Sequence, residues 1–128
     1  RRLEEEDKNS NEVEDPEFIY SYADRTGTVH WTKLSSGEQF SHTIPQFKFN
    51  SSCSLCALPQ EHIYFTGGLK TNEVVCFDRK SLTLTQRPPM LSARHGHSTV
   101  YTGGYLYAIG GFNYSNFLRE CERFSVAT

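Results

Sequence analysis

The sequence predicts an all-β protein made of repeated units of short antiparallel strands. The first observation is a near-repeat, in which "HIYFTGG" at residues 62–68 returns as "YLYAIGG" at residues 105–111. The second is that the segments on both sides of the two copies also correspond. The third is that no window of the chain carries a helical period of apolar residues. Self-similarity at a period of roughly 40–50 residues is typical of repeat folds.

Each unit contains four candidate strands separated by turns. In the earlier copy these are "SCSLCAL" (52–58), the strand that ends in two glycines, "VVCF" (74–77) and "LTLTQ" (82–86). Small, β-branched and aromatic residues at this spacing indicate a β-sandwich, a barrel or a propeller. Four strands per unit is the count of a propeller blade, so blades of four antiparallel strands are expected.

The later copy follows the same order, with "GHSTVY" (96–101) as its first strand and "ECERFSV" (120–126) as its third. Its third strand is displaced by 47 positions from "EVVCFDR" (73–79), against 43 for the glycines, so four extra residues follow its glycine pair. The chain stops after this strand. Because propellers have about 4–8 blades, we expect an incomplete ring, from a fragment of a longer protein or a truncated gene.

The glycine pairs, Gly67 with Gly68 and Gly110 with Gly111, are expected to be structural. Glycine reaches positive φ and lets another backbone come close. At the crowded inner strands of a blade, such a pair can turn the chain where a Cβ would collide with a neighbour. Ordinary hairpin glycines are the alternative, but hairpin turns rarely repeat their flanking strands.

The residues that carry this pattern resemble the kelch-repeat family. "ARHGHSTVYTGGYLYAIGGFNYSNFLRECERFSV" is similar to one kelch repeat, with a basic residue before the first strand, the Gly-Gly end and a Glu followed by an aromatic residue. The preceding segment resembles a second repeat, and "IYSYADRTGTVHWTKL" (19–34) the back half of an earlier one. The resemblance implies a kelch-type β-propeller over 18–128. Its expected parts are a partial blade at 18–34, a full blade at about 46–90 and a partial blade at about 93–128.

Charge is divided unevenly along the chain. Residues 1–17 hold eight acids and three bases and so carry a net charge of -5. Because the whole chain carries -2, residues 18–128 carry +3. The acidic stretch is expected to be a disordered or frayed-helix linker, with an acidic interaction tail as the alternative. The remainder shows no basic stripe for nucleic acid and no apolar run of the roughly 18 residues that a membrane span needs. Neither nucleic acid nor membrane is expected as a partner.

Neither a cofactor nor a metal is expected. Cys53 and Cys56 form a C-x2-C, but residues three apart on a strand point to opposite faces, and no second C-x2-C completes a site. The four cysteines are better interpreted as reduced, small hydrophobic residues than as two disulfide bonds. No catalytic residues are predicted either, because the chain lacks a nucleophile elbow and a phosphate-binding glycine loop, and its carboxylates are scattered.

Binding of a partner is the class of function that remains, and the kelch resemblance implies where a partner binds. In kelch propellers, partners dock on the loop after the diglycine and on the loop that leads into the first strand. Carried over by position, the partner-binding residues are Ser51, Ser52, Leu69, Lys70, Arg94, His95, Phe112, Asn113 and Tyr114. Their chemistry suits recognition, because arginine can bind a carboxylate through two parallel hydrogen bonds and exposed aromatic residues are good anchors of an interface.

The resemblance therefore implies a protein–protein interaction module that acts as the substrate-recognition or scaffold part of a larger intracellular adaptor. A ubiquitin-ligase adaptor of the cullin type or a cytoskeletal scaffold would be joined through a BTB, F-box or zinc-binding domain outside this chain. Two alternatives stay open. A secreted or cell-surface adhesion module would be glycosylated at Asn50 or Asn113, the two N-x-S positions. A propeller enzyme would need acid or metal clusters near the axis.

Overall fold

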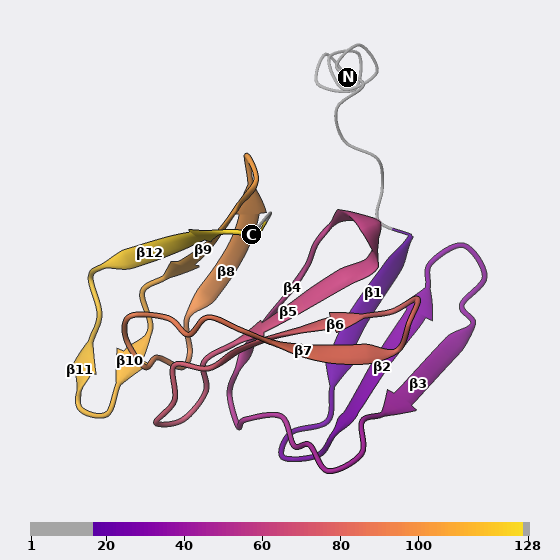
Figure 1. The fold of residues 1–128 in the computed structure, drawn as a ribbon, viewed down its shortest axis with the longest axis horizontal. Helices are drawn as coiled ribbons and strands as arrows, with labels where there is room; N and C mark the ends of the chain where they lie inside the picture. Colours follow the sequence, from indigo (N-terminus) through magenta and orange to yellow (C-terminus); the bar gives the residue numbers. More distant parts are fainter. Residues whose placement is uncertain (1–16, 127–128) are drawn as a thin grey trace.

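The computed structural model describes residues 17–126 and shows three antiparallel β-sheets arranged side by side like the blades of a fan (Figure 1). The first sheet contains β1 (Phe18–Tyr22), β2 (Thr28–Lys33) and β3 (Gln39–Thr43). The second contains β4 (Ser54–Ala57), β5 (His62–Thr66), β6 (Val74–Asp78) and β7 (Thr83–Arg87). The third contains β8 (Ser98–Thr102), β9 (Tyr105–Ile109) and β12 (Cys121–Ser125). A small hairpin, β10 (Phe112–Asn113) with β11 (Asn116–Phe117), follows β9.

The prediction of an all-β fold with four-stranded antiparallel blades is confirmed. The second sheet is one whole blade with its strands in chain order, β4-β5-β6-β7, and the third has the order β12-β9-β8. The one helical element among residues 17–126 is the short 3-10 turn Pro59–Glu61. No helix in that range is long and apolar enough to cross a membrane. The acidic linker predicted for 1–17 lies outside the described residues, except for Glu17.

Strand register aligns the repeats residue by residue. Ile63 pairs with Phe77 in the second sheet, and Leu106 pairs with Phe124 in the third. β9 and β12 therefore correspond to β5 and β6, and the β10–β11 hairpin lies in the loop that the four-residue insertion lengthens. The third sheet has no counterpart of β7 among the described residues.

The first sheet reaches Thr43 and so extends past the 18–34 segment expected from the sequence. Its β2–β3 hairpin has a four-residue loop between Lys33 and Glu38, as the β6–β7 hairpin has between Asp78 and Thr83. By this match, β1, β2 and β3 of the first sheet correspond to β5, β6 and β7 of the second. Among residues 17–126 the sheet has no counterpart of β4.

Two apolar layers hold the three sheets together. The layer between the first and second sheets includes Trp31, Phe49, Ile63, Phe65 and Phe77. The layer between the second and third sheets is built from Tyr64, Val74, Cys76, Met90, Leu106 and Ala108. Alternate residues of β5 and β6 enter opposite layers, as the two-residue period of a strand requires. β4 lies next to both β1 and β8, so the strands at one edge of each sheet gather on one side of the fan.

Candidate functional site

Loops from all three sheets meet at one end of the fan, which we call the loop end (Figure 1). It comprises residues 23–27, 44–53, 67–73, 88–97 and 110–120. Backbone hydrogen bonds join these loops in a row. Leu69 N–H donates to the Ser51 carbonyl at 2.9 Å, Gly68 N–H to the Arg94 carbonyl at 2.9 Å, and His95 N–H to the Phe112 carbonyl at 3.0 Å. The loops that the sequence pairs as docking loops are therefore adjacent in space.

The glycine pairs lie where these loops come closest. A Cβ on Gly67, whose φ is +68°, would stand 2.2 Å from the Arg94 carbonyl oxygen of the next sheet. A Cβ on Gly111, with φ +90°, would stand 2.8 Å from the His95 carbonyl oxygen. Real Cβ atoms do not approach oxygen so closely, and positive φ strains other residues. Glycine is therefore required both by the turn and by the neighbouring backbone.

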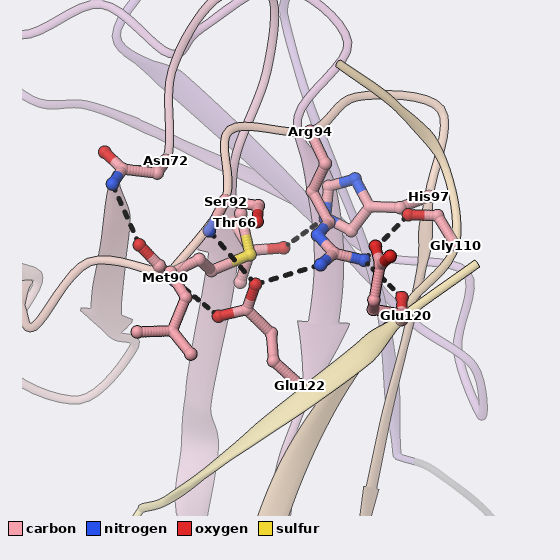
Figure 2. A network of polar contacts seen from close by, with 10 residues as sticks. Thr66, Asn72, Met90, Ser92, Arg94, His97, Gly110, Glu120 and Glu122 are labelled. Carbon is pink, nitrogen blue, oxygen red and sulfur yellow. Dashed lines mark hydrogen bonds and ion pairs between the residues drawn. The ribbon is translucent and has the colours of Figure 1, made fainter. Parts of the chain in front are cut away.

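Arg94 is the centre of a buried polar network that holds the loop before β8 (Figure 2). Its guanidinium donates to the carbonyls of Gly110 at 2.8 Å and Glu120 at 3.1 Å, and to the Glu122 carboxylate at 2.9 Å. The two oxygens of Glu122 also accept from Leu91 N–H at 2.5 Å and Ser92 N–H at 3.2 Å. The network thus ties the loop before β8 to the chain after β9 and to β12.

The assignment of Arg94 as a partner-binding residue is corrected by this network. Its side chain is 1% exposed, and its charge is already paired with Glu122. A guanidinium enclosed in this way has no face left for a partner carboxylate. The side chain donates through its two terminal nitrogens to three acceptors within the protein, so we expect Arg94 to hold the blade together instead.

The remaining predicted residues divide by exposure. Leu69, Lys70, Ser52 and Tyr114 are exposed on the loop end, whereas Ser51, His95, Phe112 and Asn113 are half-buried. Ser51 Oγ contacts Asp24 at 3.1 Å, which joins the first sheet to the row of loops. The His95 ring lies edge-on to Phe112, with centroids 5.6 Å apart. The half-buried residues therefore lie behind the exposed residues of the loop end and support them.

Phe117 is an exposed aromatic residue on the loop end that was not among the predicted site residues. It lies on β11 with 84% of its surface exposed, although Tyr114 at the hairpin tip was predicted and is 65% exposed. The Phe117 ring packs edge-on against Phe112 at 4.8 Å, and Leu118 N–H donates to the Gly111 carbonyl. The four-residue insertion after the second glycine pair is the sequence feature that points to this residue, because an insertion in a repeat maps to a loop on one face.

His97 is buried behind the loop end. Its Nε2 lies 2.8 Å from Thr66 Oγ1, and Nδ1 has no hydrogen-bond partner in the described residues. Burial, with the nearby Arg94 charge as a second cause, lowers the pKa of His97 from 6.5 to about 4. The ring is therefore neutral in the folded protein at neutral pH.

We expect this histidine to make the protein acid-sensitive. The unfolded state binds the His97 proton near pH 6.5 and the folded state only near pH 4, so its stabilising contribution is complete above pH 6.5 and is lost as pH falls. Urea unfolding between pH 7 and 5 should show a loss approaching about 1.4 kcal/mol per pH unit below pH 6.5. His97→Gln should remove this slope and the control His95→Gln should retain it. An unchanged slope in His97→Gln would assign the effect to another group.

The cysteines do not gather into a site. All four are free, and Cys53 lies against the first apolar layer while Cys56 lies against the second, on opposite faces of the sheet. Burial raises the pKa of the Cys53 thiol to about 11, so it stays protonated at neutral pH. Within residues 17–126, no group of three or more His, Cys, Asp or Glu side chains is arranged to hold a metal ion.

A cavity of about 420 Å³ lies between the second and third sheets. Register alignment shows how the two layers differ at this point. In the first sheet Trp31 and Phe40 stack with centroids 5.9 Å apart, and the matching pair in the second sheet is Cys76 with Thr85. Two small side chains therefore stand where two large rings fill the neighbouring layer.

Comparison with known proteins agrees with this geometry. The Kelch motif family matches residues 93–128. The solved structure of YjhT superposes on 79% of this chain and 32% of its own with a TM-score of 0.62, at 15% sequence identity, which shows a shared fold. The class of protein is therefore a kelch-type β-propeller, of which the chain holds part of the ring.

The particular relatives are more specific. The chain is 34% identical over 101 residues to Kelch-like protein 23 of Homo sapiens and 33% identical over 101 residues to that of Mus musculus. Each alignment covers 73% of this chain and 18% of the relative, so the chain spans about a fifth of the relatives' length. The chain belongs to the kelch-repeat family.

Proposed function

We propose that the loop end binds a protein partner, as the substrate-recognition or scaffold part of a larger adaptor. The observation that carries this proposal is the β10–β11 hairpin, which exposes Phe117 and Tyr114 on a rigid support. Phe112 backs Phe117, and His95 backs Phe112. Large apolar side chains that are exposed yet held in place lose little entropy on binding and are typical anchors of interfaces.

The row of loops continues from this hairpin across the loop end. Leu69, with 51% of its surface exposed, and Lys70 follow the first glycine pair, and Ser52 and Asp24 continue the row towards the first sheet. Loops held on a rigid β scaffold are the usual place for recognition. The mixed polar and apolar chemistry suits a folded partner or an extended peptide better than nucleic acid.

The wider role rests on the kelch relatives. We propose an intracellular, cytoplasmic adaptor that joins a cullin-type ubiquitin ligase or a cytoskeletal complex through a domain outside this chain. Four free cysteines support a reducing compartment. Catalysis is the weaker alternative. At the cavity, the Asp78 carboxylate accepts from Lys80 N–H at 2.9 Å and lies 3.5 Å from His62 Nε2, so it already serves a turn and contacts a neighbouring strand.

Phe117→Ser in the full-length protein should reduce partner recovery at least about tenfold, because a buried aromatic anchor contributes 2 kcal/mol or more. Partners would be quantified by affinity purification and mass spectrometry from cells of the source organism. Leu82→Ser is the matched control, since Leu82 is an exposed apolar residue on the β6–β7 turn. Equal recovery of all partners by Phe117→Ser, Leu82→Ser and the unmodified protein would reject the loop end as the binding surface.

A further inference from the structure

Several residues of the loop end have a left-handed backbone conformation although they are not glycine. Positive φ is uncommon for such residues, because Cβ then comes too close to the following carbonyl oxygen. Among residues 17–126, eight residues other than glycine have it. Five of them lie on the loop end, and we call them the left-handed set: Arg25 (φ 57°), Gln46 (φ 59°), Ser52 (φ 61°), Lys70 (φ 59°) and Tyr114 (φ 53°).

Two of these residues occupy a turn position that favours glycine or asparagine. Arg25 is the third residue of a turn closed by a hydrogen bond from Thr26 N–H to the Ala23 carbonyl at 3.1 Å. Ser52 has the same place in a turn that Cys53 N–H closes at 3.3 Å. A four-residue turn with positive φ at its third residue takes glycine or asparagine there most readily. Arginine and serine are therefore not the residues that these turns themselves select.

The side chains of the left-handed set do little inside the fold. All five residues are exposed. Within residues 17–126, no hydrogen bond or ion pair is formed by the side chains of Gln46, Ser52, Lys70 and Tyr114. The Arg25 side chain is 81% exposed and approaches only the Asp24 carboxylate, at 3.8 Å. Stability of the fold thus gives no reason for these side chains, and backbone outliers of this kind cluster at functional sites.

The other three left-handed residues lie away from the loop end. Gln60 and Glu61 are in the turn between β4 and β5, at the opposite end of the second sheet (Figure 1), and Leu82 is in the turn between β6 and β7. Glu61 has a role inside the fold, because its carboxylate pairs with Arg79 at 2.9 Å. Gln60, with φ 64°, has the backbone conformation of the left-handed set at a different place on the surface.

We propose that the left-handed set contacts the partner, so that the binding surface includes Arg25 and Gln46, which were not among the predicted site residues. This inference rests on the proposed function of the loop end. All five side chains can donate hydrogen bonds. The matching surface of the partner therefore offers hydrogen-bond acceptors around the apolar anchor at Phe117, which agrees with the apolar centre and polar rim of protein interfaces.

Substitution by glycine separates binding from stability at these positions. Arg25→Gly, Lys70→Gly and Tyr114→Gly in the full-length protein should each leave the melting temperature within about 2 °C or raise it, because glycine adopts positive φ without strain. Partner recovery should nevertheless fall about fivefold in each variant and at least about tenfold in the triple variant. Recovery would be measured by affinity purification and mass spectrometry, on the proteins that the unmodified protein captures and Phe117→Ser loses.

Gln60→Gly is the matched control, because it makes the same backbone change away from the loop end. It should affect the melting temperature in the same way and leave recovery unchanged. Equal losses of recovery in Gln60→Gly and in the triple variant would overturn the inference, since glycine itself would then be the cause. A fall of more than about 5 °C in the melting temperature of the triple variant would also overturn it, because the side chains would then support the fold.

Phe117→Ser distinguishes this inference from the proposed function on which it rests. Full recovery by the triple variant, with recovery lost in Phe117→Ser, would overturn the role of the left-handed set and leave the loop end as the binding surface. Full recovery by Phe117→Ser as well would reject both.

Discussion

Replacing Arg94 with alanine should lower the free energy of unfolding of the full-length protein by about 3–5 kcal/mol, the range for removing one partner of a buried ion pair. The Glu122 carboxylate, 13% exposed, would keep only its two backbone donors. The carbonyls of Gly110 and Glu120 would also lose their donor. Urea unfolding measures this loss directly.

Two comparisons separate this effect from a loss of any arginine. Arg123→Ala removes a side chain that stacks on Tyr105 at the exposed surface, and its effect should be much smaller. The double variant Arg94→Met with Glu122→Leu should lose less than Arg94→Ala, because it leaves no unpaired charge. If Arg94→Ala kept full stability and lost partner capture, Arg94 would be a recognition residue after all.

Gly67→Ala should lower the free energy of unfolding by about 3–5 kcal/mol, which combines backbone strain with overpacking. The added Cβ would stand 2.2 Å from the Arg94 carbonyl, on backbone that cannot rotate away. Moving that backbone would also disturb the hydrogen bond from Gly68 N–H to the same carbonyl. Both sides of the contact between the second and third sheets would therefore weaken.

Gly103→Ala is the matched control for this variant. Its φ of +59° resembles the +68° of Gly67, but a Cβ at Gly103 meets nothing within 4 Å. Only the conformational strain remains, which costs about 1–2 kcal/mol. Chemical denaturation of the two variants side by side gives the difference. Equal losses would mean that positive φ alone, and not the approach of the next sheet, explains the glycine at position 67.

Arg94 illustrates the limit of sequence reasoning about the candidate site. Its place in the repeat, before the first strand, was identified correctly, but the role carried over from the family resemblance was contact with a partner. Its acid, Glu122, lies 28 residues further along the chain. Only the pairing of β9 with β12 brings the two together, and side-chain burial follows from that pairing. Exposure is a property of the assembled sheets, so the sequence could not assign it.

The repeated strands, the four-strand blade, the turn positions and the glycine pairs could all be predicted from the sequence. These depend on local properties: alternation of side chains along a strand, turn chemistry and the conformational freedom of glycine. Only the tertiary structure shows that Arg94 is buried and that Phe117 is exposed. Each of these depends on which residues far apart in the chain meet across strands and between sheets, and that is set by packing.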